Sequence, residues 1–153
     1  MKRLSTEQDL QDLTARIRTL SPDSRRRWGK MSCPQMICHL TDAFRAPLGE
    51  RSPSAPRGNM VSRTVLRWLV IRTPLPFVRG APTSPEIDQA AGRGTPPAQF
   101  AADVARLLEI IERFRTQPNI ARPPHPVFGR MKQSDWARWG WAHVDHHLRQ
   151  FGA

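Results

Sequence analysis

The sequence has no long hydrophobic run. Its longest apolar stretch, residues 65–71, is interrupted by Arg67 and flanked by arginines, whereas a transmembrane helix needs about 20 consecutive apolar residues. The first segment, MKRLSTEQDLQDL, turns polar and acidic at once, so it lacks the apolar centre of a secretory signal. We therefore expect a soluble cytoplasmic protein with no membrane partner.

Cysteine is also scarce. Cys33 and Cys38 are the only two, and on a helix their spacing would point them about 140° apart around the axis. Side chains that point apart in this way cannot form a disulfide, so we expect two reduced thiols in a reducing compartment. Cys33 follows a predicted helix start, where a thiol pKa is lowered, but no other feature of the sequence indicates redox chemistry.

Lysine is rare although the chain is strongly basic. The formal net charge is +11 at pH 7, and only Lys2, Lys30 and Lys132 among the 24 basic residues are lysines. Clustered basic residues can bind phosphates of nucleic acids, but these arginines are scattered, and no recognition helix, zinc finger or RNA-binding signature accompanies them. Nucleic-acid binding is therefore not the favoured interpretation. Attraction of an anionic small-molecule substrate explains the charge at least as well.

No segment alternates apolar and polar residues over the length of a strand, so the sequence predicts an all-α fold. Ser5 with Gln8, and Ser32 with Gln35, have the spacing of capping boxes and predict two helix starts. From these signals and the apolar periodicity we expect helices at residues 5–20, 32–44, 61–73, 95–117 and 134–150.

Proline and glycine mark the irregular parts of the chain. Residues 47–97 are rich in proline, glycine, serine and arginine, which predicts a long crossover between the second helix and the later ones. Residues 118–130 contain four prolines and cannot be helical. Four main helices with such a crossover form a non-sequential four-helix bundle, and a chain of 153 residues is expected to fold as one domain, residues 1–153.

Histidines cluster in the last predicted helix. His143 and His147 are one turn apart and offset by about 40° around the helix axis, so they share a face with Trp136 and Trp139. This apolar face is expected to be buried, and His39 is expected on the inward face of the second helix. Three neutral imidazoles that converge from two helices would hold a divalent metal with open positions. The alternative is that they are hydrogen-bonded polar groups of the core.

Three further side chains are candidates for a supporting role at such a site. His125 stands between two prolines, where it could reach the pocket rim as a supporting or acid–base group, or only pack the loop. His146 lies at the edge of the histidine face, where it could donate a proton or bond to nearby backbone. Gln150 shares the ligand face and could orient a ligand or a water molecule. Asp145 points to the opposite side and should be solvated or paired with an arginine.

Several segments together resemble a known superfamily. The segments Met36-Ile37-Cys38-His39-Leu40 and His143-x-x-His146-His147 are similar to those of the DinB/YfiT-like superfamily of metal-binding four-helix bundles. Four segments resemble one bacterial branch of that superfamily. They are Trp28-Gly29-Lys30-Met31, Gly80-Ala81-Pro82-Thr83, His125-Pro126-x-Phe128-Gly129 and His146-His147-Leu148-Arg149-Gln150-Phe151-Gly152. The similarity spans residues 28 to 152.

The resemblance implies a metal site and a class of chemistry. In that superfamily the second and last helices supply three histidines to zinc, nickel or a similar ion, with iron and manganese as alternatives. Carried over, the ligands are His39, His143 and His147. Some relatives are thiol S-transferases that use a low-molecular-weight thiol such as bacillithiol or mycothiol, and others are described as metal-dependent hydrolases. Homodimers are common among such relatives, although this sequence indicates no interface.

Two functions of different classes follow from these observations. The first is a metal-dependent enzyme in which a thiol or water, activated at the three-histidine site, attacks a small molecule. The second is a non-catalytic protein in which a metal, or the histidine cluster alone, holds the bundle together. A catalytic ion keeps a position that is reachable from solvent, whereas a structural ion is fully enclosed by protein ligands.

Overall fold

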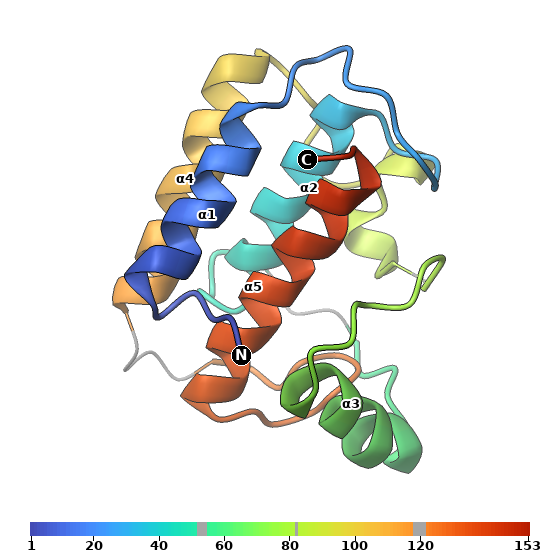
Figure 1. The fold of residues 1–153 in the computed structure, drawn as a ribbon. Coiled ribbons are helices and arrows are strands. Elements are labelled where there is room, and N and C mark those ends of the chain that lie inside the picture. The colour runs from blue at the N-terminus through green and yellow to red at the C-terminus, as the bar shows by residue number, and fades with distance from the viewer. Residues whose placement is uncertain (52–54, 82, 118–121) are drawn as a thin grey trace.

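The chain folds into a bundle of helices (Figure 1). The computed structural model describes residues 1–51, 55–81, 83–117 and 122–153. The long helices are α1 (Glu7–Arg18), α2 (Cys33–Arg45), α4 (Phe100–Thr116) and α5 (Gln133–Gln150). The short ones are η1 (Ser62–Leu66), α3 (Arg67–Arg72), η2 (Pro85–Ile87) and η3 (Gln89–Ala91). The described ranges contain no strand, so the predicted all-α bundle is confirmed.

The four long helices enclose one apolar core. Both α1 and α2 pack against α4 and α5, while α3 lies beside the N-terminal half of α5 at one end of the bundle (Figure 1). Every long helix contributes side chains to a common buried cluster, and burying each large one contributes about 1.5–3 kcal/mol. The largest fully buried side chains are Leu4, Leu13, Ile17, Met36, Ile37, Leu40, Phe44, Leu107, Ile111, Phe114, Val144 and Leu148.

One of the two predicted capping boxes forms. At the start of α2 the Ser32 hydroxyl accepts a hydrogen bond from the Gln35 amide at 3.4 Å, and the Gln35 side chain accepts one from the Ser32 amide at 2.8 Å. The box predicted at Ser5 is wrong, because α1 begins at Glu7 and has no side-chain cap. Just before it, Leu4 is fully buried and donates its backbone N–H to Ala137 of α5 at 3.1 Å. The burial of Leu4 and its hydrogen bond to α5 keep the residues before Glu7 out of α1.

Most of α5 is buried, and a glycine allows its close packing. A Cβ atom on Gly140 would lie 2.5 Å from Leu4 Cδ1 and 3.1 Å from Phe44 Cε1. Glycine therefore lets the N-terminal segment and α2 approach this helix closely. The helix starts at Gln133, one residue before the predicted start, and ends at Gln150 as predicted.

Arginines pair with the buried aspartates. Asp145 is 5% exposed, and it pairs with Arg16 and Arg149, each at 2.9 Å, which confirms the predicted arginine partner. A buried carboxylate without a partner would be strongly destabilising, so these pairs account for part of the arginine content. The other such pairs are Asp42 with Arg45 and Arg51, Asp103 with Arg106, and Asp135 with Arg67 and Arg72.

The crossover between α2 and α4 is irregular, as predicted, apart from its short helices. The predicted helix at 61–73 appears as η1 followed by α3, and the helix predicted from residue 95 begins at Phe100. Residues 122–130 are non-helical as expected, while 118–121 and Pro82 of the 80–83 motif lie outside the described residues. Among the described helices, none has both the length and the apolar character to cross a membrane.

Candidate metal centre

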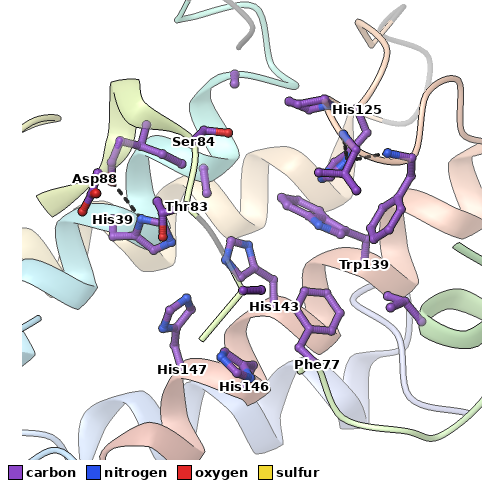
Figure 2. Close-up of a pocket in the computed structure, with 18 of the residues that line it drawn as sticks. His39, Phe77, Thr83, Ser84, Asp88, His125, Trp139, His143, His146 and His147 are labelled. Carbon is purple, nitrogen blue, oxygen red and sulfur yellow. Dashed lines mark hydrogen bonds between the residues drawn. The ribbon is translucent and has the colours of Figure 1, made fainter. Parts of the chain in front are cut away.

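Three histidines from two helices meet inside the bundle. His39 of α2 faces His143 and His147 of α5 (Figure 2). The ring centroid of His39 lies 5.5 Å from that of His143 and 4.9 Å from that of His147. The centroids of His143 and His147 are 5.1 Å apart. One ring nitrogen of each lies within 4.8 Å of the other two. Since zinc–nitrogen bonds are about 2.0–2.1 Å long, these nitrogens are near the separation at which one ion can bind all three.

Gln150 determines the tautomer of His147. The Gln150 side-chain amide donates from Nε2 to the Trp28 carbonyl at 2.8 Å, and this bond fixes which end of the amide is oxygen. Its Oε1 lies 2.9 Å from His147 Nδ1, so Nδ1 must carry the proton and donate. The Nε2 atom of His147 is left with a free lone pair, which is the state that a metal ligand requires.

A backbone carbonyl does the same for His39. Its Nδ1 lies 3.0 Å from the carbonyl oxygen of Ile87, in η2, and a carbonyl can only accept, so Nε2 again keeps its lone pair. Arg51 holds this part of the crossover in place. It donates to the Glu86 carbonyl at 2.7 Å and pairs with Asp42 of α2 at 3.1 Å.

His143 has a different environment. Its Nδ1 is buried and has no hydrogen-bond partner among the described residues. Its ring packs 5.1 Å from Trp139 and stacks on Phe77 at 6.0 Å with a 19° interplanar angle. An unpartnered buried nitrogen destabilises the fold by about 1–3 kcal/mol, so its persistence in a packed site fits a centre that binds an ion or a ligand.

Burial keeps the three imidazoles neutral. Desolvation lowers the pKa of His39. It lowers the pKa of His143 and His147 well below the ordinary value, and repulsion from neighbouring imidazoles adds to the effect at these two residues. A neutral imidazole is the form that binds a metal. Three neutral ligands also leave a divalent ion its full charge, so the donor set fits a zinc or similar ion.

A cavity of about 540 Å³ borders the three histidines, a volume typical of small-molecule sites. His125 and His146 also line it, and most of the remaining wall is apolar, including Trp28, Met31, Val70, Phe77, Phe128 and Trp139. The two lining histidines do not belong to the group of three. The site is therefore bordered by space that a small organic molecule could occupy.

The side chains predicted to support the site lie close to it in different ways. His146 is partly buried, 5.1 Å from His147 and 5.9 Å from Phe77, and burial lowers its pKa while Asp145 opposes the shift. The ring of His125 lies 5.4 Å from the indole of Trp139, which in turn lies 5.1 Å from His143. Gln150 orients a histidine, one of the two roles expected for it.

Two contributors to the site could not be assigned from the residue pattern. Phe77 covers His143 and His146 from a segment that sequence patterns identify only as a connection (Figure 2). Gly29 has a φ of +80°, and a Cβ there would lie 2.3 Å from Gln150 Nε2. This close approach lets the Gln150 amide reach the Trp28 carbonyl. The positive φ explains the glycine of the Trp28-Gly29 motif, which the sequence reveals only through the superfamily resemblance.

The cysteines are not part of the site. Both are buried and free, and burial raises the pKa of each thiol to about 11. The lowered pKa expected for Cys33 at its helix start is therefore wrong, because desolvation outweighs the favourable effect of the helix N-terminus and of the hydrogen bond with Ser24. Neither thiol is poised for redox chemistry.

Comparison with known proteins assigns the chain to a family. No curated protein and no solved structure matched it. A family model does match residues 2–153, nearly the whole chain. The chain therefore belongs to the family described as "Protein of unknown function (DUF1569)".

Proposed function

We propose that the protein is a metal-dependent enzyme of the DinB/YfiT-like type, with His39, His143 and His147 as ligands of a divalent ion. Zinc or nickel is the expected metal, with iron or manganese as alternatives. The main support for this proposal is that three neutral imidazoles, whose nitrogens lie close to one another, border a cavity of about 540 Å³. Two of them have their other nitrogen bonded to a carbonyl oxygen, as metal-ligating histidines usually do.

The proposed reaction is transfer or hydrolysis of a small molecule in the cytoplasm. A divalent ion, when bound, lowers the pKa of a water or thiol at its open position and supplies a nucleophile near neutral pH. The chain itself fixes the ligand tautomers through Gln150 and Ile87, and it excludes water with Phe77 and Trp139. Two basic side chains are near enough to attract a thiol cosubstrate with anionic groups. Lys30 lines the cavity, and Arg79 lies 4.1 Å above the ring of Trp28, which is part of the cavity wall.

A non-catalytic role for the metal predicts a different surrounding. A structural ion has all its positions filled by protein and borders no cavity. The group of three offers one ligand atom from each histidine, and the bordering cavity supplies room for an exchangeable ligand. This arrangement favours the enzyme over the structural protein.

Metal analysis of untagged protein tests the proposal. Wild-type protein purified without an affinity tag should contain about one divalent ion per chain, and His143→Ala should contain none. His146→Ala is the matched control, because this histidine lies beside the group but outside it, and it should retain the ion. Absence of metal from wild type after incubation with zinc or nickel, or equal metal in wild type and His143→Ala, would refute the site.

A further inference from the structure

His125 has the opposite tautomer from the two oriented histidines of the metal centre. Its Nδ1 lies 3.2 Å from the backbone nitrogens of both Val127 and Phe128 (Figure 2). A backbone N–H can only donate, so Nδ1 must accept both bonds with its lone pair. The single proton of the neutral ring therefore sits on Nε2, and this side chain presents an N–H donor rather than a basic nitrogen.

The loop around His125 holds this donor in a fixed position. The backbone N–H of His125 donates to the Gly129 carbonyl and the Gly129 N–H donates back, both at 2.9 Å. The ring stacks on Phe128 at 4.7 Å with a 15° interplanar angle, and it contacts the indoles of Trp136 at 5.7 Å and Trp139 at 5.4 Å. The loop thus fixes the direction of the Nε2–H bond.

The donor is directed at no protein acceptor. No described residue accepts a hydrogen bond from His125 Nε2, and the residue lines the apolar cavity beside the histidine group. Burial lowers the pKa of His125 to about 4, so the ring stays neutral over the physiological range. A fixed donor on a mainly apolar wall is a usual means by which a pocket orients a ligand.

We propose that His125 is the substrate-orienting donor of this cavity, and that its Nε2–H binds the carbonyl oxygen of an uncharged, largely apolar carbonyl compound. At His125 itself an uncharged acceptor is favoured, because this neutral donor does not compensate the desolvation of a buried carboxylate. Among the described residues, the basic side chains that line the cavity, Lys30 and Arg51, make no hydrogen bond or ring contact with His125. The walls formed by Trp28, Val70, Phe77 and Trp139 fit an apolar or aromatic body. The fate of the bound compound rests on the proposed function, but its binding to His125 requires no metal.

The tautomer can be measured directly in metal-free protein. Long-range ¹H–¹⁵N correlation spectra of ¹⁵N-labelled protein at pH 7 should show His125 with an unprotonated Nδ1 and a protonated Nε2. Comparison with His125→Asn assigns the signals. A protonated Nδ1, or both nitrogens protonated at this pH, would overturn the inference.

Two substitutions separate the two jobs of the ring. In His125→Asn the Oδ1 atom occupies the place of Nδ1 and can accept the loop hydrogen bonds, but nothing replaces Nε2. In His125→Gln the side-chain Nε2 corresponds to the ring Nε2 and remains a donor, whereas the loop acceptor is lost. If the ring of His125 only supports its loop, His125→Gln should lower the stability of the protein more than His125→Asn does. If the ring orients a ligand, His125→Asn should weaken ligand binding more than His125→Gln does.

The binding probe is 4-(dimethylamino)cinnamaldehyde, whose absorption moves to longer wavelength when its carbonyl oxygen accepts a hydrogen bond. Metal-free wild type should bind it with this shift. His125→Asn should lose the shift and bind about three- to tenfold more weakly, the effect of one neutral hydrogen bond, while His125→Gln should retain part of it. An unshifted spectrum with wild type, or an equal shift with His125→Asn, would refute the inference.

The corresponding carboxylate, 4-(dimethylamino)cinnamate, tests the preference for an uncharged ligand. It should bind metal-free wild type more weakly than the aldehyde does, and tighter binding would overturn that part of the inference. Because the tautomer and the binding of both probes are measured in metal-free protein, failure of this inference is distinguishable from failure of the metal proposal. The metal content of His125→Asn should equal that of wild type after zinc loading.

Discussion

The amide of Gln150 fixes the imidazole of His147 through a hydrogen bond of 2.9 Å. The two residues are three apart on α5, so the helix itself places donor and acceptor on one face. The second hydrogen bond of the amide, to the Trp28 carbonyl, connects the last helix to the loop before α2. A single polar side chain thus joins the orientation of a candidate ligand to the packing of a distant loop.

Replacing Gln150 should weaken metal binding without unfolding the protein. Gln150→Met has a similar shape but leaves His147 Nδ1 without its acceptor, so the ring loses its fixed tautomer. Loss of such a supporting hydrogen bond typically weakens metal affinity by about 10- to 100-fold. Competition with a zinc-binding dye measures the affinity, and circular dichroism checks the helices. Arg149→Gln, on the exposed side of the helix, is the control, and equal affinity in both variants would contradict the assigned role.

Gly29→Ala should disturb the same hydrogen bond from the other side. The new Cβ would lie 2.3 Å from Gln150 Nε2, so the amide must move. Gly49 is a matched control, because its φ of +77° is similar and a Cβ there would have no neighbour within 4 Å. Both substitutions should reduce the free energy of unfolding by about 1–2 kcal/mol through the left-handed backbone, measured by urea unfolding. Only Gly29→Ala should also weaken zinc binding.

The sequence was sufficient to predict the helices and the histidine face, because both depend on local periodicity. The spacing of His143 and His147, with the apolar residues around them, identified the buried side of α5, and Ser32 with Gln35 located the start of α2. The Ser5 box failed because burial of Leu4 overrode a local signal. The roles of Phe77 and of the Ile87 carbonyl depend on the path of an irregular crossover, which no periodicity encodes.

The candidate site could be predicted only in part from the sequence, for a similar reason. His39 could be assigned to an inward face, but its meeting with the α5 pair depends on how α2 and α5 pack. The sequence left His125 open between a pocket role and a packing role, since its tautomer depends on two backbone N–H groups of its own loop. The Cys33 thiol was misjudged because local position indicates the helix dipole but does not reveal burial.

The titration of His125 should make the protein less stable in mild acid. Its pKa is lowered from 6.5 to about 4 in the folded state, so between these values the unfolded chain binds more protons, and stability falls as the pH decreases from about 6.5 towards 4. From pH 7 to pH 5 this linkage removes about 2 kcal/mol. Urea unfolding of metal-free protein at the two pH values measures it.

His125→Asn is the variant that isolates this contribution. Asparagine keeps an acceptor for the loop but does not titrate, so the variant should lose about 2 kcal/mol less than wild type between pH 7 and pH 5. The other buried histidines titrate in both proteins, and their effects cancel in the difference. An equal loss in wild type and variant would show that His125 is charged in the folded state at pH 5.

Removing the ring of Phe77 should expose the metal centre to solvent. The ring stacks on His143 and leans on His146 at 5.9 Å, and it comes from the crossover rather than from a core helix, so the bundle should remain folded in Phe77→Ala. Water and chelators would then reach the ligands more easily. Zinc-loaded Phe77→Ala should lose its metal to excess EDTA several-fold faster than wild type, with a smaller effect in Phe77→Leu. Leu75→Ala is the control, because Leu75 is 53% exposed and is not among the residues that line the cavity, and its release rate should match wild type. Equal rates for Phe77→Ala and wild type would mean that the chelator enters from another side of the cavity.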